Sequence, residues 1–254
     1  MRSSYPHSGL ASPRLRRLTQ QPRSVGSAEA PGSVEAPEER CELCSTPLAA
    51  EHRHLVDLES RALLCACRAC STLFDRSAAG GGHYRLVPDR RLRLEDFELD
   101  DAAWDRLRIP VEMAFFFRNS SLGRVMAFYP SPMGATESRL ELSAWQELEE
   151  ANPVLAGMEA DVEALLVNRA RGRHGQWLVP IDDCYRLVAV IRTRWRGFTG
   201  GKKVWLEIER FFEELDRRAR PHRGDPVARP AHAAASNPPP VHPVARNPEL
   251  AERS

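Results

Sequence analysis

The sequence predicts an α+β protein in which a short cysteine-rich segment precedes a larger domain of strands and helices. Five of the six cysteines lie between Cys41 and Cys70. Short apolar runs bounded by turn residues, typical of strands, come mainly before residue 130, and apolar residues at helical spacing dominate after it. Strands that come first and helices that come later are typical of α+β domains.

Composition separates both ends of the chain from its middle. Residues 1–39 and 221–254 hold thirteen of the twenty prolines but only one aromatic residue, Tyr5, and all Trp and Phe residues lie between 40 and 220. Segments without large apolar groups cannot offset the entropy that is lost on ordering. We therefore predict a disordered tail over 1–39, a cysteine module over 40–75, an α+β domain over 76–220 and a disordered Pro/Ala-rich tail over 221–254.

Charge and hydropathy exclude several classes of function. The chain has 36 basic and 35 acidic residues and a formal net charge of +1, so we expect no nucleic-acid partner. No apolar run approaches the roughly eighteen residues that span a bilayer, so we expect no membrane span. The arginines at 14, 16 and 17 are not followed by an apolar segment, so no export signal is expected. Reduced thiols without an export signal are typical of the cytoplasm.

The cysteines form two pairs with the spacing of metal ligands. Cys41 and Cys44 are separated by two residues, as are Cys67 and Cys70. A tight turn in each pair directs two sulfurs at one ion, and two such turns complete a tetrahedron around Zn²⁺. We predict one structural Zn²⁺ held by these four thiolates.

The third thiol of the second group leaves the ligand set open. Cys65 could replace Cys67 as a ligand; otherwise it is expected to be a small buried residue in a strand. An iron–sulfur cluster is the alternative metal centre, because four thiolates also hold such clusters. His52 and His54 alternate with Arg53 and Leu55 in the preceding strand, so we expect both histidines on the surface rather than at the metal.

The segment between the two pairs predicts a β-hairpin. Residues 51–58 and 62–65 have strand character, and residues 59–61 form a polar turn that would return the second pair beside the first. Over residues 40–75 this layout resembles a zinc ribbon. Zinc ribbons commonly place glycine after the second cysteine of each pair, whereas this chain has Ser45 and Ser71.

The first part of the larger domain predicts further strands. Glycines 80–82 lack the Lys-Ser/Thr of a phosphate loop and are expected to form a joint before a strand at 84–87. Residues 111–117 and 124–129 flank a turn-rich break and predict a hairpin. Residues 129–134 are expected to be irregular, because prolines two residues apart disrupt a sheet ladder. The side chains expected in the hairpin core are Phe115, Phe117, Val125 and Phe128.

The second part predicts helices. Ser143 and Gln146 have capping-box spacing, and Asn152 before Pro153 predicts a second helix start. A strand is expected at 176–179, a helix from Asp182 or Asp183, and a last helix over 204–218 after glycines 200 and 201. The expected apolar faces are Val154, Leu155, Met158, Val162, Leu165 and Leu166; then Cys184, Leu187, Val188, Ile191, Trp195 and Phe198; then Val204, Ile208, Phe211, Phe212 and Leu215.

The sixth cysteine is the best candidate for a nucleophile. Cys184 follows two aspartates near a predicted helix start, and a helix N-terminus lowers a thiol pKa. However, Cys184 also lies on the apolar face of that helix, and capping alone explains acids at a helix start. His83 and His174 lie beside glycines, and nothing in the sequence pairs them with this thiol. We therefore assign no catalytic residue, and a non-catalytic role is favoured.

Five strings of the sequence are distinctive, namely Cys41-Glu-Leu-Cys44 and residues 52–55, 64–70, 128–137 and 180–185. Together they resemble an uncharacterised actinobacterial family that is often encoded beside nickel–iron hydrogenase genes. The resemblance covers about residues 40–218. It implies an accessory or maturation role, with a hydrogenase subunit or maturation factor as partner, but it assigns no reaction.

These observations together predict a non-catalytic zinc-binding accessory protein that acts through protein–protein contacts. The cysteine module and the segment 130–138 are the expected contact surfaces, since loops that contain Pro and Gly lie on the surface and are common recognition sites. The alternative is a redox or iron–sulfur protein, either an electron carrier or a thiol enzyme, that uses the cysteine cluster.

Overall fold

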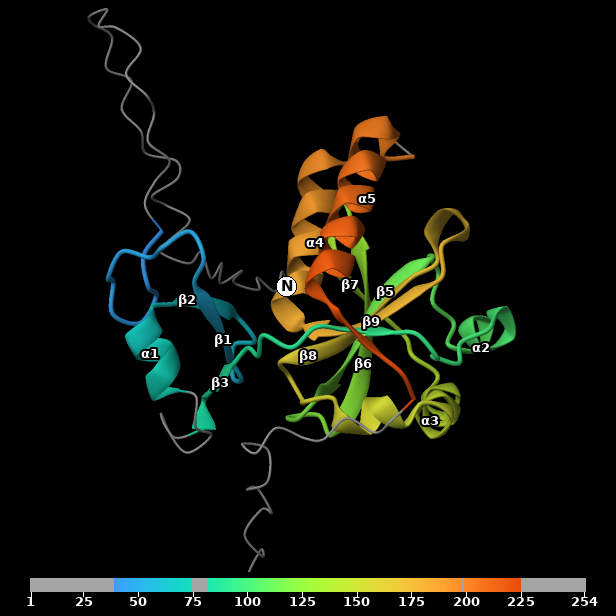
Figure 1. The fold of residues 1–254 in the computed structure, drawn as a ribbon, viewed down its shortest axis with the longest axis horizontal. Helices are drawn as coiled ribbons and strands as arrows, with labels where there is room; N and C mark the ends of the chain where they lie inside the picture. Colours follow the sequence, from blue (N-terminus) through green and yellow to red (C-terminus); the bar gives the residue numbers. More distant parts are fainter. Residues whose placement is uncertain (1–38, 75–81, 198, 225–254) are drawn as a thin grey trace, which may run out of the picture. The chain divides into compact units, whose positions relative to one another are not determined.

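The computed structural model describes residues 39–74, 82–197 and 199–224 (Figure 1). Most of both expected tails, glycines 80 and 81, and Phe198 lie outside the described residues. The described residues form two sheets and five α-helices, so the predicted α+β class is confirmed. In this part of the chain, no helix combines the length and the apolarity that crossing a bilayer requires.

The smaller sheet is built around the predicted cysteine hairpin. Strands β1 (Arg53–Asp57) and β2 (Leu63–Ala66) pair antiparallel, and β3 (Tyr84–Leu86) pairs with the other edge of β1. The carboxylate of Asp57 closes the turn by accepting the N–H groups of Glu59 and Ser60. Helix α1 (Arg68–Leu73) follows β2 and was not predicted. The hairpin and the strand near residue 84 are therefore confirmed.

The larger sheet has seven strands in the order β10-β4-β9-β8-β5-β6-β7. All neighbouring pairs are antiparallel except β10 and β4, which are parallel. The predicted hairpin and the predicted strand near 176–179 are confirmed as β5–β6 and β9. The strands are β4 (Leu92–Leu94), β5 (Met113–Asn119), β6 (Arg124–Ser131), β7 (Gly134–Ser138), β8 (Glu163–Asn168), β9 (Gly175–Pro180) and β10 (Arg220–His222).

Helices cover both faces of this sheet and bury its central strands. Helices α4 (Ile181–Arg194) and α5 (Gly201–Arg218) pack side by side over one face, with Phe115 and Leu166 in their core cluster (Figure 1). Helices α2 (Asp101–Arg106) and α3 (Leu142–Ala151) share the other cluster with Phe116 and Leu165. Successive strand residues point to opposite faces, so each central strand contributes to both cores. The last two predicted helices are confirmed as α4 and α5, but α4 ends at Arg194, so Trp195 is its C-cap rather than part of its apolar face.

The predicted helix over residues 153–166 is wrong. The segment forms a short 3₁₀ helix, η3 (Pro153–Gly157), and then strand β8, in which all six residues are buried. A strand buried on both faces is apolar throughout, so its sequence also satisfies helical spacing. Asn152 makes no side-chain cap; its amide donates to the carbonyl oxygens of Leu148 and Glu98 and joins the end of α3 to another segment.

Two boundary predictions are also wrong. Residues 129–131 continue β6, and Pro130 pairs with Ala135 of β7. Pairing with β5 extends only as far as Phe128. Beyond Phe128 one side of β6 has no strand partner among the described residues, so a missing N–H on that side breaks no ladder bond. Helix α3 begins at Leu142 rather than after a Ser143 cap, and the Ser143 hydroxyl donates to Glu141 instead.

Candidate metal centre

The first cysteine pair lies in a tight turn. The Cys41 N–H donates to the Thr46 carbonyl oxygen (2.9 Å), and the Ser45 N–H donates to the Cys41 carbonyl oxygen (2.8 Å). Ser45 has a φ of 62°, which is in the left-handed region that glycine favours. Serine therefore takes the backbone conformation for which zinc ribbons commonly use glycine.

The second pair lies at the start of a helix. Cys67 is the N-cap of α1, and its sulfur accepts the Cys70 N–H at 3.5 Å. Ser71 is buried inside that helix, and its N–H donates to the Cys67 carbonyl oxygen. A helical residue has no need of positive φ, which explains why this pair is not followed by glycine.

The two turns bring four sulfurs together. The ligand atoms of Cys41, Cys44, Cys67 and Cys70 all lie within 4.8 Å of one another, and the Cys44 and Cys67 sulfurs are 3.6 Å apart. Tetrahedral Zn²⁺ with bonds of about 2.3 Å places its sulfurs roughly 3.8 Å apart. These four cysteines can therefore bind a metal ion. Their assignment as ligands and the identity of the metal stay predictions.

The pKa values of Cys41, Cys44 and Cys70 are shifted in different directions. Hydrogen bonds from the Thr46 hydroxyl and N–H lower the pKa of Cys44 to about 6. Burial raises the pKa of Cys41, but backbone N–H groups of Cys67, Cys44 and Leu43 outweigh it and leave the pKa lowered. Burial and hydrogen bonds to the other three thiols raise the pKa of Cys70 to about 12. A divalent cation among them would favour the thiolate form of all four.

The structure places Cys65 in a different group. Its sulfur, one imidazole nitrogen of His52 and one of His54 lie within 4.8 Å of one another. The side chains of the two histidines are only 10% and 25% exposed, so the expectation that they lie on the surface is wrong. A contact from outside the hairpin contributes to this burial, because His54 hydrogen-bonds to Asp182 on α4.

One family model matches this chain, over residues 40–219, and its description is Family of unknown function (DUF5947). The chain belongs to this family. The match begins one residue before Cys41 and ends one residue after α5, so it includes both the cysteine hairpin and the larger sheet. A search of curated proteins found no significant match, nor did a search of solved structures.

The sixth cysteine of this DUF5947 chain lies in the core. Cys184 is fully buried, and burial, followed by the charges of Asp183 and Asp182, raises its pKa well above the ordinary value. Asp183 accepts from Arg91 Nε at 2.5 Å, and Asp182 binds His54. Both aspartates at the start of α4 therefore have ion-pair or hydrogen-bond partners, and the thiol is not activated as a nucleophile.

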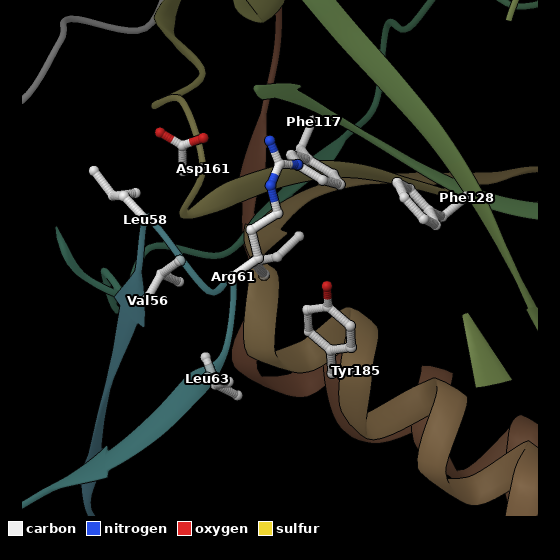
Figure 2. A pocket seen from close by; sticks show the side chains of 9 residues that line it. Val56, Leu58, Arg61, Leu63, Phe117, Phe128, Asp161 and Tyr185 are labelled. Carbon is white, nitrogen blue, oxygen red and sulfur yellow. The ribbon is translucent and has the colours of Figure 1, made fainter. Parts of the chain in front are cut away.

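The DUF5947 domain also has a pocket that the sequence did not reveal. It lies between the β1–β2 hairpin, β5–β6 and α4, and its lining combines apolar side chains with Arg61, Asp161 and Tyr185 (Figure 2). Figure 2 shows the Tyr185 hydroxyl directed into the pocket. Burial raises the pKa of this tyrosine, as does the neighbouring Cys184. Residues from segments so far apart meet only in the folded chain, so no local motif marks the site.

Proposed function

We propose that this protein is a non-catalytic accessory protein whose cysteine segment holds one structural Zn²⁺. The observation that carries the proposal is the convergence of Cys41, Cys44, Cys67 and Cys70 on one point from two separate turns. Within residues 39–74, only three side chains other than Cys41 are both apolar and buried, namely Leu55, Val56 and Ala66. So few apolar groups give the segment little core of its own, and structural zinc commonly supplies the missing stability in such modules.

The arrangement of the two turns supports zinc. Both adjoin the β1–β2 hairpin, and Glu42 joins them: its N–H donates to the Cys65 carbonyl oxygen (2.9 Å), and its carboxylate accepts the Cys65 N–H (2.8 Å). A pair of turns held together beside a short hairpin is the layout of a zinc ribbon. The thiolate donors also suit an iron–sulfur cluster, which is the alternative that the experiment must separate.

The partner that we propose is a protein of the nickel–iron hydrogenase system, and the compartment is the cytoplasm. Support for the partner comes from the resemblance of the quoted sequence strings to a hydrogenase-associated family. A contact surface is suggested by the β6–β7 turn, in which Met133 is 89% exposed beside Pro132. Proline limits the entropy that a loop loses on binding, and an exposed methionine offers an adaptable apolar contact.

The metal centre is tested on the purified full-length chain. We expect a colourless protein. X-ray absorption at the zinc edge should show a zinc ion with sulfur ligands only, at zinc–sulfur distances of about 2.3 Å. Cys67→Ser should remove this centre, and Cys65→Ser should retain it. A brown protein that contains iron would establish the iron–sulfur alternative, and loss of the centre in Cys65→Ser with retention in Cys67→Ser would reverse the ligand assignment.

The accessory role is tested by capture of partners from the native organism. We expect the full-length chain to retain a hydrogenase subunit or maturation factor, and Met133→Glu to lose it while the thermal midpoint stays unchanged. Leu122→Glu is the matched control, because Leu122 is 52% exposed in the β5–β6 turn, at the opposite end of β6. Equal capture by all three proteins would exclude the β6–β7 turn as the contact.

A further inference from the structure

A second group of metal-binding side chains lies on one face of the cysteine hairpin. His54 is directly opposite Cys65 in the β1–β2 ladder, and His52 comes two residues earlier. Residues two apart in an extended chain point to the same side, and directly opposed residues have neighbouring side chains. This explains why the donor atoms of all three residues lie within 4.8 Å of one another.

The hydrogen bonds of the two imidazoles leave one nitrogen of each ring free to bind a metal. His52 Nδ1 lies 3.0 Å from the Ala49 carbonyl oxygen, which can only accept, so Nδ1 carries the proton. His54 Nδ1 lies 2.8 Å from the Asp182 carboxylate and likewise donates. In each neutral ring Nε2 then has the lone pair. His52 Nε2 is buried and has no hydrogen-bond partner among the residues that the structure describes.

An unpartnered buried imidazole nitrogen is unusual because buried polar atoms are nearly always paired. A metal ion coordinated by this lone pair would satisfy it. The bond between His54 and Asp182 has the geometry of the carboxylate–histidine pairs that orient metal ligands in proteins. Both observations concern atoms that belong to this group and not to the four-cysteine cluster.

We propose that His52, His54 and Cys65 form a second metal site, distinct from the four-cysteine centre, that binds Zn²⁺ through two imidazole nitrogens and one thiolate. Zn²⁺ accepts this donor set, and three protein ligands leave one position of its tetrahedron for water or a small ligand. Among the described residues, no fourth donor belongs to the group. Asp182 is a positioning residue, because it acts on the metal only through His54.

The pocket of Figure 2 lies next to this site. Val56 and Leu63 line the pocket and pair with each other in the β1–β2 ladder. They are two residues away from His54 and Cys65 along each strand, so both pairs lie on the same face of the hairpin. Ile181, which also lines the pocket, directly precedes Asp182. The pocket has a volume of about 520 Å³, which includes the solvent-filled space at its opening. A fourth metal ligand would therefore have apolar walls nearby, with Arg61 and Tyr185 as hydrogen-bonding groups.

The test is the zinc content and ligand set of the full-length chain after titration with Zn²⁺. We expect about two zinc ions per chain. X-ray absorption at the zinc edge should give zinc–nitrogen distances of about 2.0–2.1 Å in addition to the zinc–sulfur distances. The double variant His52→Ala/His54→Ala should bind about one ion, with sulfur ligands only. His174→Ala is the control, because it removes an exposed imidazole and should leave both the content and the spectrum unchanged.

The outcomes separate this site from the proposed structural centre. Saturation at one ion with sulfur ligands only, in the wild-type chain, would overturn the second site and leave the structural centre intact. One ion with mixed nitrogen and sulfur ligands, in the wild-type chain, would support the second site and defeat the first. Because the wild-type spectrum decides between these outcomes, neither conclusion depends on the folding of a variant.

The role of Asp182 has its own readout. Asp182→Asn should keep both ions but weaken zinc binding at the second site by about 10–100-fold, measured by competition with a chromophoric chelator. The same substitution in the double histidine variant should leave the affinity of the remaining ion unchanged. An unaltered affinity in the single Asp182→Asn variant would show that the carboxylate does not position His54 for metal binding.

Discussion

At the scale of single residues, the buried carboxylate of Glu163 depends on its hydrogen-bond and ion-pair partners. Its side chain is fully buried at the start of β8, and its carboxylate accepts from Arg90 Nε (2.8 Å) and from the Glu159 N–H (2.9 Å). Arg90 also donates to the Gly157 carbonyl oxygen at 2.9 Å. An ionised carboxylate that loses such partners retains the full cost of its burial.

We expect Arg90→Met to lower the free energy of unfolding by about 3–5 kcal/mol, because it leaves a buried charge without its partner. The matched control is Arg106→Met, since Arg106 and Glu147 form a pair whose side chains are 53% and 61% exposed. That substitution should cost about 0–1 kcal/mol. Urea unfolding measures both, and similar losses would show that Glu163 is solvated in the native state.

Cys184 provides a second test at the residue scale. Because its raised pKa keeps the thiol neutral and burial keeps reagents away, iodoacetamide should not modify it in the folded chain at neutral pH. Cys184→Ala should cost only about 1 kcal/mol of stability and leave partner binding and any hydrogenase-linked phenotype in place. A stable variant that had lost its function would instead support a thiol enzyme.

At the scale of elements, local pattern was sufficient where one face of an element is solvated. Helix α5 alternates buried residues such as Val204 and Phe211 with charged ones. The predicted helix begins at residue 204, three residues after the observed start at Gly201. Strand β8 has no solvated face, so spacing could not distinguish strand from helix. The histidines were misplaced for a related reason: alternation along β1 shows which residues share a face, but it does not reveal that Asp182 of α4 contacts His54 on that face.

The cysteine hairpin is the element whose stability should depend on metal. Structural zinc contributes apparent free energies of about 10–16 kcal/mol in small modules. Complete removal of zinc by a chelator should therefore abolish hydrogen-exchange protection in β1 and β2. Because β3 pairs with β1, it should lose protection as well, whereas β5, β8 and β9 should keep theirs. Protection in β1 that survives verified metal removal would show that the hairpin folds without metal.

At the scale of the molecule, the sequence placed the end of the folded region a few residues too early. The composition assigns Pro221 and His222 to the tail, but both belong to β10, which pairs with β4. Beyond them, Arg223 Nε donates to Glu95 at 2.6 Å. Three-residue strands have too few positions for a pattern, and their pairing partner is more than a hundred residues away, so this boundary could not be read locally.

A chain of residues 39–224 should therefore unfold at the same temperature as the full-length protein, since composition gives the omitted ends few groups that could pack. A chain of residues 39–219, which lacks β10, should unfold at a lower temperature because β4 loses its parallel partner. Differential scanning calorimetry compares the three. A large drop for the 39–224 chain would show that an omitted end packs against the domain.

The four-cysteine cluster was predictable because spacing alone nearly determines it, whereas the pocket and the histidine group depend on contacts between distant segments. The hydrogen bond between His54 and Asp182 joins positions 128 residues apart and connects the hairpin to the first turn of α4. Tyr185, one helical turn further along, lines the pocket. Occupants of the pocket and of the histidine group would therefore act on the same helix end. If one of them changes the affinity for the other, thermodynamic linkage requires an equal effect in return. A small molecule that tightens zinc binding would itself be held more tightly by the zinc-loaded protein.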